Sequence, residues 1–143
     1  MYLQVTESRK IIGRLRKGDD LLGALTGICQ EMGITLGEVK AIGAVSQARI
    51  GYYHQDTRQY EWLDLPQPRE ILALEGNISL KDGQPFVHAH IMLSDGEGRA
   101  FGGHLADGTL VFAAEFVIQE LKADKSLDRQ MDEETGLFLW PKK

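Results

Sequence analysis

The sequence predicts a fold of the α+β type, in which strands joined by hairpins form a sheet that carries one main helix. Three observations support this prediction. Apolar residues recur at helical spacing most clearly from Leu21 to Met32. Apolar and polar residues alternate in Phe86–Ser94, as in a strand with one buried face. Turn-forming residues occur at Asp95–Gly98 and at Asp107-Gly108, so neighbouring strands can pair as hairpins.

The N-terminal part is predicted to begin with strands and then form the helix. Tyr2–Arg16 mixes apolar and polar residues and is interpreted as one or two strands. Lys17–Asp20 is a turn whose acidic residues can cap a helix N-terminus, and Gly33 supplies the stop. The following residues, Ile34–Tyr53, are small or β-branched with interspersed glycines. We expect short strands there, broken by turns or bulges.

A hairpin and a further strand are predicted in the middle of the chain. Gln47–His54 and Arg58–Leu65 have the composition of paired strands. Arg69–Gly76 is interpreted as another strand, and Lys81–Pro85 as a short connection into the alternating segment. His54 is isolated in sequence from the other three histidines, so we expect it at the surface or at a sheet edge.

The C-terminal part combines a long apolar run with a charged tail. Thr109–Leu121 fits a helical face in part, but its aromatic and β-branched residues and the preceding turn favour a strand. Lys122–Thr135 is charged and is expected to be a loop. Leu137–Trp140 is too apolar to remain in solvent, so it should dock on the body of the protein or on a neighbouring subunit.

Length and composition limit the class of protein. The chain has 143 residues, of which 43% are hydrophobic, so residues 1–143 fit a single domain with a real core. The net charge of −5 supplies no basic field, and direct DNA binding is expected to be weak or absent. The single cysteine, Cys29, lies in the helical pattern and is expected to be a buried core residue of a protein from a reducing compartment. No apolar run long enough to span a membrane is visible, so we expect a cytoplasmic protein.

Three of the four histidines lie within Phe86–Leu105. His88 and His90 occupy one face of the alternating strand. If the loop of the following hairpin is Asp95–Arg99, His104 lies opposite His90 and the three imidazoles converge. A loop one residue shorter would turn His104 to the other face. The hypothesis of a metal site therefore depends on the hairpin register.

Three imidazoles with one open position are the ligand set of a catalytic zinc centre. The alternative is a row of polar side chains satisfied along a sheet face. Glu115 is a charge in an apolar run and could orient a ligating histidine or act as general base, or it could simply face solvent at an edge. Glu75 and Asn77 could face the same cavity, and Arg69 or Arg99 could hold an anionic substrate.

Together these motifs resemble the PPC family, the plant and prokaryote conserved domain, from about Ile12 to Leu121. The residues that carry the resemblance are Glu70-Ile71-Leu72, Gly76-Asn77-Ile78-Ser79, His88-Ala89-His90 with Leu93-Ser94, Gly102-Gly103-His104-Leu105, and Glu115. The resemblance implies a compact α/β domain with a mostly antiparallel sheet, a helix packed on it and a homotrimeric assembly, followed here by a tail over residues 122–143. It also implies a distant similarity of fold to zinc-dependent enzymes such as acetolactate decarboxylase, whose metal is likewise held by an H-x-H pair and a further histidine.

Plant members of this family carry AT-hooks, Arg-Gly-Arg-Pro segments that enter the DNA minor groove, and no such segment occurs in this chain. The chain therefore resembles a stand-alone bacterial or archaeal member. Two classes of function remain open. One is a metal-dependent lyase or hydrolase for a small oxygenated substrate, with zinc or another divalent metal on His88, His90 and His104 and with Glu115 carrying protons. The other is a non-catalytic regulatory module, associated with DNA through partners, whose metal stabilises the fold.

Overall fold

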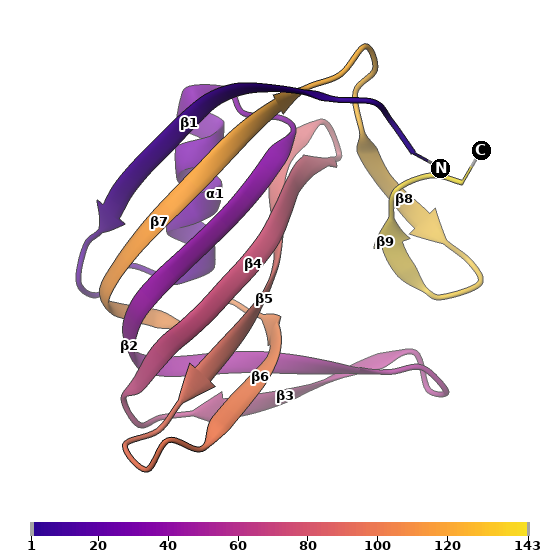
Figure 1. Cartoon of the computed structure of the whole chain (residues 1–143). Helices are drawn as coiled ribbons and strands as arrows, with labels where there is room; N and C mark the ends of the chain where they lie inside the picture. Colours follow the sequence, from indigo (N-terminus) through magenta and orange to yellow (C-terminus); the bar gives the residue numbers. More distant parts are fainter. Residues whose placement is uncertain (1, 143) are drawn as a thin grey trace.

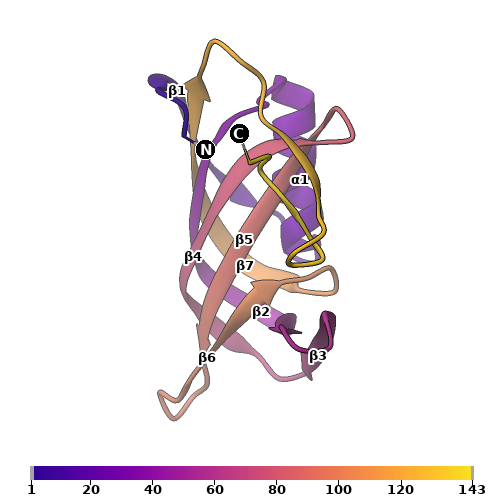
Figure 2. The same cartoon turned by 90° about the vertical axis from the view of Figure 1, so that its right-hand side faces the viewer.

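The computed structural model describes residues 2–142 and contains, within them, one helix and nine strands. The elements in chain order are β1 (Thr6–Leu15), α1 (Leu21–Met32), β2 (Gly37–His54), β3 (Gln59–Leu65), β4 (Arg69–Lys81), β5 (Gln84–Ser94), β6 (Ala100–Leu105), β7 (Leu110–Lys122), β8 (Asp128–Asp132) and β9 (Leu137–Leu139). The helix covers one face of a mostly antiparallel sheet, which confirms the α+β prediction (Figures 1 and 2). Within the described part of the chain, no helix is long and apolar enough to cross a membrane.

Helix α1 begins and ends where its capping residues predict. A side-chain oxygen of Asp20 accepts a hydrogen bond from the Gly23 backbone N–H at 2.8 Å, which satisfies one of the free donors of the first turn. Gly33 ends the helix in the left-handed region, with φ of 65°. The side chains fully buried against the sheet are those of Leu21, Leu25 and Cys29. Burial raises the pKa of the Cys29 thiol to about 11, so this cysteine is an inert core residue, as expected.

Strand β2 is one bent strand of 18 residues, and the prediction of several short strands over Ile34–Tyr53 is wrong. Its register shifts between Ala41 and Gln47, where β-bulges bend the strand. Gly43 has φ of 142°, and a Cβ atom there would overlap the Ala113 carbonyl oxygen. The first half of β2 pairs with β4 and β7, and the second half pairs with β3 and β6 (Figure 1). The glycine marks a bend in a continuous strand.

Strand β4 pairs with the first half of β2, and β6 pairs with the second half. Strand β5 lies between β4 and β6 and pairs with both. A two-residue turn at Asp82-Gly83 joins β4 to β5, so both strands extend into the segment that was expected to be a longer connection. One face of β5 packs into the core beneath α1, through Val87, Ala89, Ile91 and Leu93. The residues between them, His88, His90 and Met92, therefore lie on the outer face of the sheet.

The C-terminal tail contains two strands, and the prediction of a loop over Lys122–Thr135 is wrong for Asp128–Asp132 and holds for residues 123–127 and 133–135. Strand β8 pairs in parallel with the end of β4 and antiparallel with β9, which forms the C-terminal hairpin in Figure 2. The indole N–H of Trp140 donates a hydrogen bond to the Ser79 hydroxyl at 3.2 Å. This contact docks the apolar segment Leu137–Trp140 on the body of its own chain, one of the two places expected for it.

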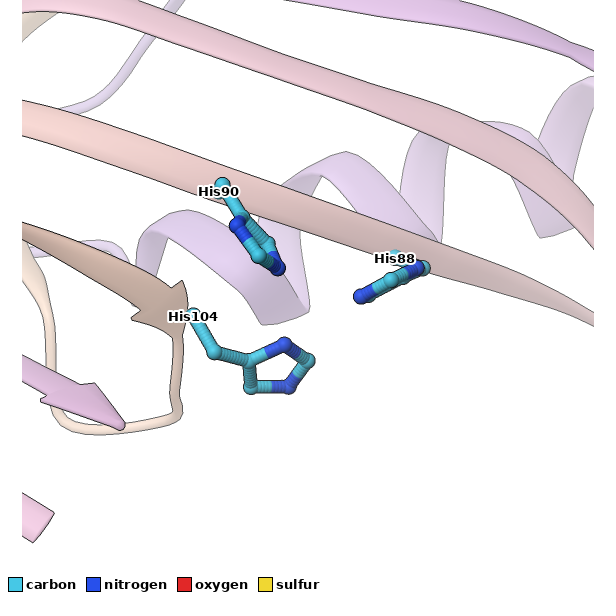
Figure 3. A group of neighbouring side chains, drawn as sticks. All are labelled: His88, His90 and His104. Atoms are coloured by element: carbon cyan, nitrogen blue, oxygen red, sulfur yellow. The ribbon is translucent and has the colours of Figure 1, made fainter. Parts of the chain in front are cut away.

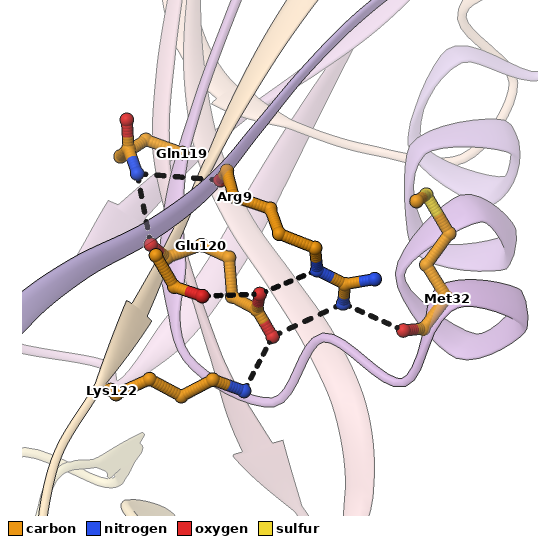
Figure 4. Close-up of polar contacts among 6 residues, drawn as sticks. Arg9, Met32, Gln119, Glu120 and Lys122 are labelled. Atoms are coloured by element: carbon orange, nitrogen blue, oxygen red, sulfur yellow. Dashed lines mark hydrogen bonds and ion pairs between the residues drawn. The ribbon is translucent and has the colours of Figure 1, made fainter.

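A buried carboxylate ties β1 to β7 and to the end of α1 (Figure 4). The side chain of Glu120 is 2% exposed and accepts hydrogen bonds from Arg9 Nε at 2.7 Å and from Lys122 Nζ at 2.7 Å. The Ser8 hydroxyl donates to the same carboxylate, and Arg9 Nη2 also donates to the Met32 carbonyl oxygen. The hydrogen bond from Arg9, followed by that from Lys122, lowers the pKa of Glu120 to about 2.

We expect Glu120→Gln to lower the free energy of unfolding at neutral pH by about 1–3 kcal/mol, after allowance for solvent screening of the half-exposed cations. The folded-state pKa of about 2 lies below the unfolded value. The stabilisation that ionised Glu120 supplies is therefore present at neutral pH and is lost as pH falls from about 4.3 toward 2. Urea unfolding at neutral and acidic pH measures it. The control is Glu31→Gln, on the exposed side of α1, and an equal loss in both variants would contradict the prediction.

Candidate metal centre

The hairpin of β5 and β6 has the register that brings the histidines together. Ser94 pairs with Ala100 and His90 pairs with His104, so the loop consists of the five residues Asp95–Arg99. The carboxylate of Asp95 closes this loop, since it accepts hydrogen bonds from the Arg99 backbone N–H at 3.0 Å and from Arg99 Nε at 2.7 Å. The Arg99 hydrogen bond lowers the pKa of Asp95 and keeps it ionised.

His88, His90 and His104 point toward one another in Figure 3. Their ring centroids lie 5.3 Å apart for His88 and His90, 5.0 Å for His88 and His104, and 5.6 Å for His90 and His104. One nitrogen of each ring lies within 4.8 Å of the others. Two nitrogens on a tetrahedral zinc ion are about 3.3 Å apart, so a small contraction of this arrangement would allow coordination.

The surroundings favour the neutral form of His88 and His104, which metal ligation requires. Burial, and then the positive charge of Arg129 and the other two histidines, lowers the pKa of His88 to about 4. Burial, followed by His90 and Arg129, also lowers the pKa of His104. Nδ1 of His104 is buried and has no hydrogen-bond partner among the described residues. The three side chains could therefore hold a divalent metal ion.

The three histidines line a cavity of about 850 Å³, which we call the histidine cavity. Its walls include the hairpin of β2 and β3, through Tyr53, Arg58 and Tyr60, and the C-terminal hairpin of β8 and β9. Two hydrogen bonds join these walls: Tyr53 Oη donates to the Thr135 carbonyl at 2.7 Å, and Arg58 Nη1 donates to the Glu133 carbonyl at 3.1 Å. The other lining residues include the aromatic side chains of Tyr53, Tyr60, Phe86 and Phe138 and the cationic side chains of Arg58, Lys81 and Arg129.

Glu75 and Asn77 lie on the same face of the sheet as the histidines. Glu75 pairs across β4 and β5 with His90, but its side chain is 73% exposed and forms an ion pair with Lys40 at 3.5 Å. Asn77 pairs with His88, and its Oδ1 accepts a hydrogen bond from Arg129 Nη2 at 2.7 Å. Both residues are neighbours of the histidines, and neither is among the residues that line the histidine cavity.

The structure does not bring Glu115, Arg99 or Arg69 to the histidines. Glu115 lies on β7, which is separated from β5 by β2 and β4, or roughly 14 Å at the usual strand spacing. Arg99 is held in the hairpin loop by Asp95. The guanidinium of Arg69 lies over the Phe101 ring, 4.9 Å from its centroid.

Arg129 is a residue of the candidate site that the sequence did not reveal. It is 7% exposed and lines the histidine cavity from β8. The burial of Leu127 and Arg129 between more exposed neighbours is visible in the structure and not in the sequence. Because the tail is rich in charged residues, an arginine there looked like an ordinary surface residue.

Several known proteins are similar to this chain. A metal-containing protein from Archaeoglobus fulgidus has 39% sequence identity and a TM-score of 0.93, with 99% of each chain covered. A plant- and prokaryote-conserved protein from Pyrococcus horikoshii has 36% identity and a TM-score of 0.91, with 98% of this chain and 96% of that chain covered. A candidate DNA-binding protein from Bacteroides thetaiotaomicron has 26% identity and a TM-score of 0.85, with 96% of each chain covered.

Curated relatives include the bifunctional protein GlmU from a strain of Synechococcus sp., which is 34% identical over 124 residues. The match covers 86% of this chain and 19% of that protein, so the chain spans about a fifth of the length of the relative. The Plants and Prokaryotes Conserved (PCC) domain model matches residues 2–122, which contain strands β1 to β7, helix α1 and the histidines His88, His90 and His104. This match, and structural agreement over nearly the whole chain, show that the chain belongs to the PCC domain family, which is also abbreviated PPC.

Proposed function

We propose that the protein is a metal-dependent lyase or hydrolase for a small oxygenated substrate, with zinc held by His88, His90 and His104. The observation that supports this most is the convergence of three imidazoles on an open cavity large enough for a small molecule. When bound, the ion would supply Lewis acidity beside the substrate. The similar protein from A. fulgidus is named as metal-containing, which agrees with this proposal.

The remaining residues of the cavity position the ligands and restrict water. The Tyr60 ring packs against the His104 ring, with centroids 5.1 Å apart, and limits its rotation. Burial raises the pKa of the Tyr60 hydroxyl, so it stays protonated and can donate a hydrogen bond at neutral pH. Phe86 and Phe138 supply apolar surface for the carbon skeleton of a substrate.

A non-catalytic module associated with DNA is the second candidate. The observation in its favour is the name of the B. thetaiotaomicron protein as a candidate for DNA binding. The net charge of −5 opposes direct binding, because neutralisation of phosphates supplies most non-specific affinity. We therefore favour the metal-dependent enzyme.

We expect the purified protein to bind zinc and His90→Ala to retain a small fraction of the wild-type content. His90 lies between the other two ligands in the hairpin register, and loss of one donor in three removes much of the affinity. Elemental analysis after dialysis measures the content. The control is His54→Ala, since His54 is half-buried at the end of β2, outside the histidine cavity, and pairs with Glu61. Equal zinc in wild type and His90→Ala would refute the ligand assignment.

We expect turnover of a small ester or hydroxy acid by zinc-loaded protein and none by metal-free protein. The test is a screen of such compounds with wild type, His90→Ala and His54→Ala, each assayed with and without added zinc. Activity should follow zinc content, being absent in His90→Ala and retained in His54→Ala. A zinc-loaded protein that turns over none of these compounds would favour the non-catalytic module.

We further propose a homotrimer with the histidine site near a subunit boundary. The outer face of the sheet carries exposed apolar side chains, which we call the outer patch: Ile12, Ile42, Leu72 and Val117. Exposed apolar side chains gathered on one face are typical of a surface that binds another protein. Glu75 lines the hollow over this patch and also pairs with His90, so the patch adjoins the histidines. Glu115 lines the same hollow, and a role at the histidines would require a neighbouring subunit.

Light scattering should give about three times the chain mass of 16.0 kDa. We expect Ile42→Glu to lower the mass toward that of a monomer, because it places a charge in the outer patch. Trp140→Ala should leave the trimer intact, since Trp140 docks on its own chain. A wild-type protein that is monomeric at micromolar concentration would rule out the assembly.

A further inference from the structure

The buried guanidinium of Arg129 has no anionic partner in the part of the chain that the structure describes. Its Nη2 donates to the Asn77 side-chain oxygen at 2.7 Å, its Nε to the Ser79 hydroxyl at 3.1 Å, and its Nη1 to the Phe138 carbonyl at 3.1 Å. All three acceptors are neutral. A buried charge without a counter-ion is costly, and proteins usually pair such a group.

The contacts of Arg129 hold the guanidinium in place and leave donors unused. A guanidinium has five N–H groups, and the three hydrogen bonds leave one on each terminal nitrogen. The Phe86 and Trp140 rings flank the group, with centroids 5.5 Å and 5.6 Å from its central carbon. Because Arg129 lines the histidine cavity, an anion in that cavity can reach the unused donors. Two adjacent N–H groups match the two oxygens of a carboxylate.

The histidine cavity is cationic although the protein is acidic. Arg58, Lys81 and Arg129 line it, and Glu134 is the single acidic residue in its lining. Glu134 is itself paired with Lys142. The local charge therefore favours an anionic ligand, in contrast to the net charge of −5 for the chain.

Arg129 and the histidines are close enough to contact one small molecule. Asn77, which accepts a hydrogen bond from Arg129, pairs directly with His88 across β4 and β5. The positive charge of Arg129 is also one of the causes that lower the pKa of His88 and His104. A ligand with a carboxylate at one end and an oxygen at the other can span the two groups.

We propose that the ligand of the histidine cavity is a small carboxylate with a second oxygen, and that Arg129 binds its carboxylate group. This inference rests on the proposed metal-dependent function and names the substrate class of that site. Arg129 lies on β8, outside residues 2–122 that match the family model. The C-terminal hairpin thus supplies the group that selects the substrate, while the family segment supplies the histidines.

Calorimetric titration with lactate and mandelate, each compared with its neutral amide, tests this proposal. Wild type should bind at least one carboxylate about tenfold or more tightly than the matching amide, the usual scale for charge-assisted hydrogen bonds. Arg129→Met should bind that carboxylate no more tightly than its amide. Arg129→Lys should bind the carboxylate with an affinity between those of wild type and Arg129→Met. The control is Arg16→Met, which changes an exposed arginine outside the cavity and should bind as wild type does.

Melting temperature and zinc content are measured for every variant, and the wild-type comparison of acid with amide does not depend on any variant folding. Equal affinity for acid and amide in wild type, no binding of either, or full carboxylate affinity in folded Arg129→Met would overturn the proposal. Carboxylate binding that depends on Arg129 in a protein that never takes up zinc would support the proposal and refute the metal-dependent function. A zinc-dependent activity on neutral esters, with no preference for carboxylates, would support the metal-dependent function and overturn the proposal of a carboxylate ligand.

Discussion

The length of the loop between β5 and β6 fixes which face of the sheet His104 occupies. With five residues in Asp95–Arg99, His104 stands opposite His90, while Leu105 faces the core and is fully buried. A change of one residue would exchange the two faces of β6, so that an imidazole entered the core and a leucine entered the cavity. The burial of Leu105 and the convergence of the three histidines therefore depend on the same register.

The approach of β6 to the bent half of β2 reinforces this register. Gly103 faces β2, and a Cβ atom there would lie 2.8 Å from the Gly51 carbonyl oxygen. A register shift would bring Gly102 or His104 to that position, and a histidine side chain would not fit. The bulges that bend β2 thus bring its second half beside the histidine hairpin.

Local signals made the helix and the hairpin predictable. Asp20 and Gly33 act within one turn of the helix they cap, and Asp95 closes a loop of five residues. The residues that determine these elements therefore lie within short segments of sequence. Strand order could not be predicted in this way. Glu115 was assigned to the site because it is a charge in an apolar run, yet β7, which carries it, inserts between β1 and β2. The burial of Arg129 beside the histidines escaped prediction because its partners, Asn77 and Ser79, lie about fifty residues earlier in the chain.

The two hydrogen bonds that join the walls of the histidine cavity have an evolutionary consequence. Their donors are the side chains of Tyr53 and Arg58, but their acceptors are the main-chain carbonyl oxygens of Thr135 and Glu133. Every amino acid carries that acceptor. Substitutions at 133 and 135 can therefore accumulate without breaking the bridge, whereas a change at 53 or 58 removes a donor. The tip of the C-terminal hairpin can diversify in sequence while the cavity that it encloses keeps its shape.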